Sequence, residues 1–173
     1  IMSQITKNNE TYKLTLDPKE LYLVNNQWNI APDNSIEFGD QGLRIHNFFI
    51  EHNESKFIVE SVHDRFNDDL NIAMKDFNIS DISKIIEKDT ALVKGTVDGN
   101  VLLKRVAESY GLISDIKVNN LIVREVPIGN VNLKAERVDA GKFNLDLNLS
   151  GPDNNMTVNG YYIPRGNANS INI

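Results

Sequence analysis

The sequence contains no cysteine, which excludes disulfides, thiolate metal ligands and a cysteine nucleophile. Basic residues are scattered: Lys104-Arg105 is the longest Lys/Arg run and the net charge is −6, so we expect no nucleic-acid interface. No apolar run approaches the ~20 residues that cross a bilayer, and no signal peptide is predicted. Because the chain opens on Ile1-Met2 and stops within the alternation "SINI", we expect 1–173 to be a single β-rich fragment of a larger polypeptide.

Residues that could support catalysis or metal binding are also sparse. The three histidines are His46, His52 and His63. In "HNFFIEH", His46 and His52 are six positions apart, which puts them on the same face of a strand, with Glu51 on the other face. This spacing matches no established metal motif and is typical of solvent-facing strand and turn residues. We therefore expect no enzymatic activity, no metal site and no cofactor.

Alternation of apolar and polar residues is the main pattern of the chain. In "FNLDLNLSGPDNNMTVNGYY", every second residue from Phe143 to Leu149 is apolar, and the alternation resumes at Met156 after a Pro-Asp-Asn turn. A period of two places all apolar side chains on one face of a strand. Similar stretches recur at about ten-residue spacing along the chain, which predicts an all-β antiparallel meander of roughly a dozen short strands.

A few segments depart from simple alternation. "NISDISKIIEKD" has isoleucines at helical spacing with Ser80 as N-cap, which predicts one short helix near 80–88. "LLKRVAESYG" fits a helix, or a strand followed by a loop, nearly equally well. Gly95 and Gly99 lie within a strand pattern, where glycine indicates close backbone approach or a bend and not a phosphate loop. "WNIAPDNSIEFG" and "LNLSGPDNNMTVNG" share one turn sequence and predict two similar hairpins.

The predicted strands supply more apolar surface than one short helix can cover. Roughly thirty apolar side chains on one face cannot be left in water at ~25 cal/mol per Å², and monomers rarely expose patches larger than a few hundred Å². The pattern leaves two solutions open. The sheet closes on itself as a sandwich or barrel, or it forms a trough that holds an apolar ligand.

Three stretches share a pattern that covers most of residues 20–163. The first is residues 28–38, a "W-x-I" strand that turns into "I-x-F". The second is "LNIAMKDFNISDISKII" leading into "GTVDGNV", and the third runs from "LIVREVPIGNVNLKAE" through "FNLDLNLSG" to "VNGYY". Together these stretches resemble the TamB/AsmA-type proteins of the Gram-negative envelope. The family is recognised by pattern more than by invariant residues.

The resemblance implies a long, curled, taco-like antiparallel β-meander with an apolar inner groove. It implies a periplasmic segment of a protein anchored in the inner membrane, which holds or conducts phospholipid acyl chains toward the outer membrane without catalysis. A related role in outer-membrane biogenesis, with an Omp85-type barrel partner contacted through the rest of the chain, is also implied. The residues expected to line the groove are Trp28, Ile30, Ile36, Phe38, Leu43, Ile45, Phe57, Val59, Leu70, Ile72, Met74, Val93, Val97, Ile116, Val118, Leu121, Val123, Val131, Leu133, Phe143, Leu145, Leu147, Leu149, Met156 and Val158.

Two other functions remain open on the sequence. One is a closed β-sandwich that serves as a surface or adhesion module. The other is an assembly or chaperone module, in which an exposed sheet edge pairs with client strands of outer-membrane β-barrel proteins. Asp115 and Asn47 are expected to interrupt the inward apolar rows and thus the continuity of a groove.

Overall fold

The computed structural model describes residues 3–19, 21–23, 26–81, 83, 92–106, 109–139, 142–163 and 170–172. Its architecture is all-β, and residues 79–81 and 83 are helical, which confirms the start of the helix expected near 80–88; residues 82 and 84–91 lie outside the described residues. The strands are β1 (Ser3–Asn8), β2 (Thr11–Leu16), β3 (Leu21–Leu23), β4 (Asn26–Ile30), β5 (Ser35–Gly39), β6 (Gly42–His46), β7 (Phe48–His52), β8 (Ser55–Ser61), β9 (Leu70–Asn78), β10 (Val93–Val106), β11 (Ser109–Val123), β12 (Val126–Asp139), β13 (Lys142–Ser150), β14 (Asn155–Ile163) and β15 (Ser170–Asn172).

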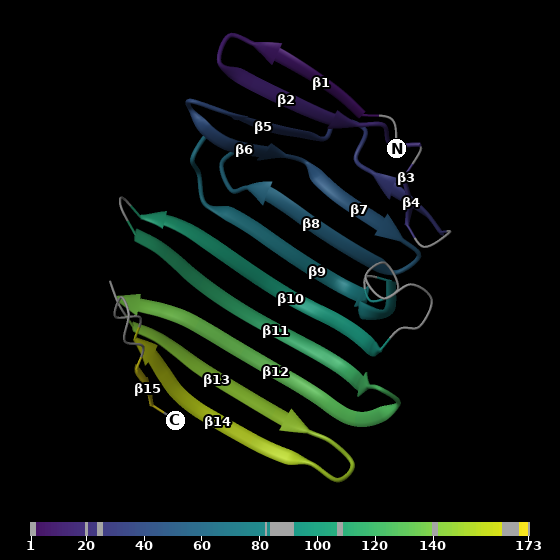
Figure 1. Ribbon diagram of the computed structural model, residues 1–173, viewed down its shortest axis with the longest axis vertical. Helices are drawn as coiled ribbons and strands as arrows, with labels where there is room; N and C mark the ends of the chain where they lie inside the picture. Colours follow the sequence, from purple (N-terminus) through teal and green to yellow (C-terminus); the bar gives the residue numbers. More distant parts are fainter. Residues whose placement is uncertain are drawn as a thin grey trace.

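These strands form two antiparallel sheets. The larger has eleven strands in the order β15-β14-β13-β12-β11-β10-β9-β8-β7-β4-β3, so β7 to β15 form an uninterrupted meander. The smaller has four strands in the order β1-β2-β5-β6. The sheets adjoin where β6 meets β8, and the Ile45 amide there donates to the Ser61 hydroxyl at 3.0 Å. Figure 1 shows the strands side by side, with the smaller sheet next to the N-terminal strands of the larger one.

The meander is confirmed, but neither sheet is strongly curled, so the taco-like curl is not seen in this chain. The sequence predicted short strands, but the central strands are long: β10, β11 and β12 contain 14, 15 and 14 residues, respectively. The ambiguous "LLKRVAESYG" stretch falls on the end of β10 and the start of β11, so the strand interpretation holds for its described residues.

Local irregularities allow these long strands to stay paired. Opposite the register shift between Val97 and Gly99, Asp76 adopts a left-handed φ of 44°. The Asp98 carboxylate accepts hydrogen bonds from the Asp76 amide at 2.9 Å and from the Asn119 side chain at 3.1 Å, which ties β9, β10 and β11 together. Gly99 has a φ of 143°, and a Cβ there would collide with the Asp115 carbonyl oxygen. The close backbone approach predicted for this glycine is therefore confirmed.

The two Pro-Asp-Asn turns have different outcomes. The second joins β13 to β14 in the expected hairpin, closed by a 2.7 Å hydrogen bond from the Gly151 amide to the Asn154 carbonyl. The first hairpin was predicted wrongly, because β4 and β5 belong to different sheets. Asn34 explains the difference: its buried side chain accepts from the Leu16 amide and donates to the Leu16 carbonyl, both at 2.9 Å, and so directs the chain to β2.

The most buried part of the molecule lies at the N-terminal end of the large sheet. Leu21, Trp28, Ile30 and Phe77 form one cluster in which each residue is at most 5% exposed. The Trp28 ring lies 6.0 Å from the Phe77 ring, centroid to centroid, and 5.5 Å from the His52 ring. This cluster fixes β3 and β4 against β7 and β9, because burial of aromatic rings contributes several kcal/mol.

Candidate functional site

The strand register places apolar side chains of the large sheet on one face. In an antiparallel sheet, residues directly opposite one another point to the same side. Leu133 on β12 is opposite Leu147 on β13, which is opposite Val158 on β14. On the other side of β12, Leu133 is opposite Ile116 of β11. The same relation continues strand by strand to Trp28 on β4.

We call this side of the sheet the apolar face. It contains most of the residues predicted to line a groove: Trp28, Ile30, Phe57, Val59, Leu70, Ile72, Met74, Val93, Val97, Ile116, Val118, Leu121, Val123, Val131, Leu133, Phe143, Leu145, Leu147, Leu149, Met156 and Val158. Four predicted residues are elsewhere. Ile36, Phe38, Leu43 and Ile45 share one face of the four-stranded sheet instead.

Several residues of the apolar face were not predicted. Phe77 is opposite Val97 and therefore shares the face with Met74, although three positions separate it from Met74. The bulge at Asp76 adds a residue to β9 and resets the alternation, a change that the apolar pattern does not reveal. Phe48 and Ile50 were missed for a similar reason, since Asn47 has a left-handed φ of 43° and separates β6 from β7.

Exposure rises from the N-terminal to the C-terminal part of this face. Trp28 is 1% exposed, whereas Leu145 is 38% and Met156 48% exposed. Within the described part of the chain, the contacts of β11, β12 and β13 are chiefly with their neighbours in the sheet, and no strand lies over them. Among the described residues, the C-terminal half of the apolar face therefore has no strand that covers it.

The opposite face of the same strands is polar. Asp98 is opposite Lys117, which is opposite Asn132, which in turn is opposite Asn148. Lys134 and Asp115 form an ion pair across β12 and β11 at 3.5 Å. The expectation that Asp115 interrupts the apolar row is therefore wrong, because its side chain belongs to the polar face. The division is not complete, since Leu102 and Ile113 lie on the polar face and Ser114 on the apolar face. It nevertheless gives the sheet one mainly polar side suited to water and one mainly apolar side.

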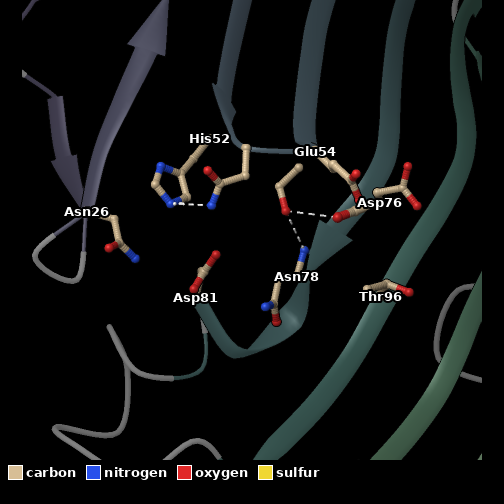
Figure 2. Close-up of a pocket in the computed structure, with 9 residues that line it drawn as sticks. Asn26, His52, Glu54, Asp76, Asn78, Asp81 and Thr96 are labelled. Carbon is tan, nitrogen blue, oxygen red and sulfur yellow. Dashed lines mark hydrogen bonds between the residues drawn. The ribbon is translucent and has the colours of Figure 1, made fainter.

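A polar pocket of about 470 Å³ lies at one end of β7, β8 and β9, beside the start of the helical segment (Figure 2). The Ser55 hydroxyl donates to the Asp76 carbonyl at 2.8 Å and accepts from the Asn78 amide at 3.2 Å. His52 Nε2 accepts from the side-chain Nδ2 of Asn53 at 2.9 Å, so its Nδ1–H donates to the backbone carbonyl of Gln27 at 2.8 Å. These contacts hold the strand ends together and occupy both ring nitrogens of His52.

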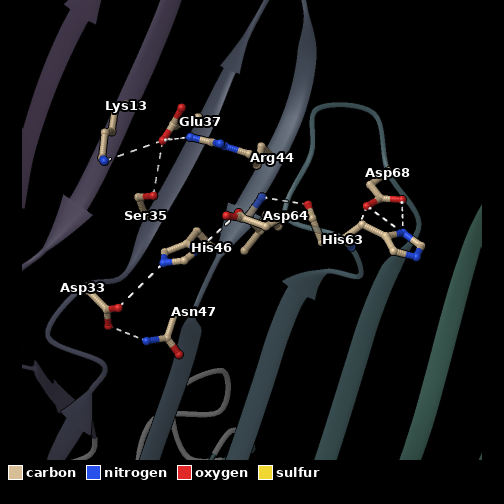
Figure 3. A network of polar contacts seen from close by, with 12 residues as sticks. Lys13, Asp33, Ser35, Glu37, Arg44, His46, Asn47, His63, Asp64 and Asp68 are labelled. Atoms are coloured by element: carbon tan, nitrogen blue, oxygen red, sulfur yellow. Dashed lines mark hydrogen bonds and ion pairs between the residues drawn. The ribbon is translucent and has the colours of Figure 1, made fainter.

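A second polar group connects β2, β5 and β6 (Figure 3). Arg44 contacts Glu37 at 2.8 Å and Lys13 contacts the same carboxylate at 3.6 Å. Burial opposes ionisation of Glu37, but the hydrogen bond and charge of Arg44, helped by Lys13, outweigh it and lower the pKa of Glu37. The hydrogen bond to Glu37 exceeds the opposing effect of burial and raises the pKa of Arg44. This group joins β2, β5 and β6 of the small sheet.

The remaining histidines make turn contacts. His46 Nδ1 lies 3.1 Å from Asp64 and its Nε2 lies 3.7 Å from Asp33. His46 is on β6 and His52 on β7, in different sheets, so the prediction that they share a strand face is wrong. The Asp68 carboxylate accepts from the His63 amide at 2.6 Å; burial opposes its ionisation, but the hydrogen bonds from His63 and Asp69 lower the pKa of Asp68.

No three metal-ligating side chains converge among the residues that the structure describes. The same residues include no helix with the length and apolar character needed to cross a bilayer. Comparison of the chain with family models, curated proteins and solved structures found no match. The TamB/AsmA resemblance therefore depends on sequence pattern, and the apolar face is the feature of the structure on which a functional argument can be built.

Proposed function

We propose that the apolar face of the large sheet holds phospholipid acyl chains, within a non-enzymatic segment of a TamB/AsmA-type protein. The observation that carries the proposal is the strand register, which joins the alternating apolar residues of β4 and β7 to β14 into one continuous face. The half-exposed side chains on β13 and β14 support it, since a ligand could reach them without unfolding the sheet.

The driving force would be the transfer of methylene groups out of water. Each buried CH₂ contributes about 0.8 kcal/mol, so about ten methylenes against the apolar face would contribute about 8 kcal/mol, which is of the same order as the ~4–15 kcal/mol cost of association. The binding surface in this segment is an open, weakly curved face. In a longer sheet of the kind that the resemblance implies, the twist between neighbouring strands would accumulate into a taco-like trough.

The wider setting is part of the same proposal. The protein would be anchored in the inner membrane of a Gram-negative bacterium and extend through the periplasm, where it would carry lipid toward the outer membrane. An Omp85-type barrel would be a partner through other parts of the chain. Passive transfer of lipid between apolar surfaces requires no cofactor and no covalent step. No nucleic-acid partner is proposed.

Lipid extraction and mass spectrometry of the purified chain test this proposal. We expect phospholipid to be retained by the wild-type chain and lost in Leu147→Asp, because a carboxylate on the apolar face is costly to desolvate beside acyl chains. Asn148→Asp is the matched control, since it adds the same charge to the adjacent residue on the polar face of β13. Wild-type protein that carries no lipid after incubation with phospholipid vesicles would contradict the proposal.

The edge of the sheet favours a second candidate function, the capture of client strands. β14 pairs with β13 along one edge, but β15 pairs with its other edge only from Tyr161 to Ile163, so among the described residues no strand covers that outer edge over 155–160. That strand, "NMTVNGYYI", has no charged residue and no proline, which are the usual protections of a sheet edge. Binding of a peptide from an outer-membrane barrel strand, undiminished by excess phospholipid, would support this role. The side-by-side sheets do not favour a closed sandwich.

A further inference from the structure

The chain exposes more surface than a compact monomer of its length. Its accessible surface is 11170 Å², whereas a compact monomer of this size exposes about 8,500 Å². The excess, roughly 2,700 Å², agrees with the single-layer arrangement of β9 to β14, which no strand covers among the described residues. A standard protein interface removes only about 800 Å² of surface from each partner. The exposed surface is therefore large enough for a macromolecular partner.

The uncovered part of the apolar face is wide in both directions. β9 to β14 are neighbouring strands, and six strands at ~4.8 Å each span about 29 Å. Along β13, the six residues from Phe143 to Leu149 extend about 20 Å at ~3.4 Å per residue. The flat area is thus about 580 Å² on one copy and about 1,200 Å² for two copies. This value reaches the ~1,200–2,000 Å² of a specific interface, and projecting side chains add to it.

This area has an uncharged centre. On β12, β13 and β14, the side chains that point to the apolar face are uncharged within 131–135, 145–149 and 156–160. A row at its margin contains Arg137, which is opposite Phe143, and Phe143 is opposite Tyr162. An apolar centre with arginine and aromatic residues toward the rim is typical of protein interfaces. A two-fold axis brings equivalent side chains together, and an uncharged centre avoids repulsion between like charges there.

The opposite face of the sheet limits the association to two copies. Lys117, Lys134, Asp115 and Asp146 lie on that face, so its favourable environment is water. Two identical sheets have the same twist, and they can stack about 10 Å apart with their strands within about 30° of each other. A second copy of the sheet therefore matches the apolar face in both shape and charge.

We infer that a second copy of this chain covers the apolar face of β9 to β14 when no lipid is bound, and that the two sheets form a sandwich across a two-fold axis. Acyl chains and the second copy contact the same side chains, Leu133 and Leu147 among them, so each excludes the other. Lipid therefore shifts the equilibrium toward the monomer by mass action. This competition rests on the proposed function, whereas the dimer itself does not.

The oligomeric state of the lipid-free chain tests the dimer. Lipid is removed from the purified full chain on an apolar exchange resin, and gel filtration with multi-angle light scattering gives the molar mass over a dilution series. We expect the mass of two chains at high concentration, and the mass of one chain after incubation with dioleoyl phosphatidylcholine vesicles. Leu147→Asp should be monomeric, because the sandwich would bury a carboxylate from each copy. Asn148→Asp adds the same charge on the polar face and should remain dimeric; circular dichroism establishes that both variants are folded.

The absence of cysteine allows the interface to be located, since a single introduced thiol is the only one in the chain. Leu133→Cys places the thiol on the apolar face, and Asn132→Cys places it on the polar face of the same strand. Reaction of Leu133→Cys with a water-soluble maleimide should slow about tenfold when roughly nine-tenths of the chains are dimeric. Asn132→Cys is the matched control and should react at the same rate at every protein concentration.

Each outcome separates the dimer from the proposed function. A lipid-free chain that is monomeric at every concentration would overturn the inference and leave the proposed function intact. A dimer in which both cysteines react equally fast would also overturn it, because the interface is then another surface, such as the edge of β14. A protected dimer that phospholipid does not dissociate would support the sandwich but contradict the competition and, with it, the proposed function.

Discussion

Trp28 offers the sharpest test of how the sheet is stabilised. It is the only tryptophan of the chain, it is 1% exposed, and it packs against His52 and Phe77. Its indole Nε1 is buried and has no hydrogen-bond partner among the residues that the structure describes. Two substitutions separate the contributions of the ring and of this N–H group. Trp28→Ala removes the ring, whereas Trp28→Phe keeps an aromatic ring and removes only the unsatisfied donor and part of the volume.

The expected magnitudes differ clearly. Truncation of a buried aromatic residue to alanine costs about 3–5 kcal/mol, because contacts are lost and a cavity remains. In Trp28→Phe, the smaller ring leaves a smaller cavity, and removal of a buried unpaired N–H returns part of a desolvation penalty of about 1–3 kcal/mol. We therefore expect Trp28→Phe to lower the free energy of unfolding by less than about 1.5 kcal/mol.

Urea unfolding followed by far-ultraviolet circular dichroism measures both values, since tryptophan fluorescence is lost in the variants. The slope of the free energy against urea should stay constant if the variants unfold to the same state. Asn29→Ala, at the exposed position next to Trp28 on β4, controls for a general effect on that strand. If Trp28→Phe costs as much as Trp28→Ala, the indole N–H contributes a favourable interaction and the reasoning is wrong.

Two further outcomes follow from the structure. Gly99→Ala should lower the free energy of unfolding by about 3 kcal/mol, because the new Cβ would collide with the Asp115 carbonyl oxygen and Gly99 has a left-handed φ. Asn100→Ala, at the next position, should change the free energy of unfolding little. Equal effects of the two substitutions in urea unfolding would contradict this prediction. The pKa of Glu37 is lower in the folded chain than its ordinary value of 4.5, so its stabilisation is complete above that value and is lost as the pH falls through the folded pKa. Glu37→Gln should therefore reduce the loss of stability as the pH falls below about 4.5, and unchanged pH dependence in thermal unfolding would refute the assignment.

The amino-acid sequence by itself determined the architecture of the C-terminal half. From Phe143 to Val158, the period of two, the Pro-Asp-Asn turn and the absence of charge on one face are local properties. They predict a hairpin with an apolar side, and the β13–β14 register confirms it. Antiparallel neighbours that are adjacent in the chain need no distant contact to be specified. The helix was predictable for the same reason, from the isoleucine spacing. The prediction of Ser80 as N-cap is wrong, because the helix begins at residue 79 and the Asn78 side chain accepts from the backbone amide of Ser80 at 2.9 Å.

Where the local sequence pattern allows two structures, tertiary contacts decided which of them forms. The same Pro-Asp-Asn sequence makes a hairpin at Pro152 but sends the chain to another sheet at Pro32, because Asn34 finds the backbone of Leu16, eighteen residues away, as its partner. The bulge at Asp76 brings Phe77 into the core through Asp98, which is distant in sequence. The row of Arg137, Phe143 and Tyr162 exists only in the register of three strands. A period of two specifies which side chains share a face of one strand, but hydrogen bonds between distant segments set which strands are neighbours.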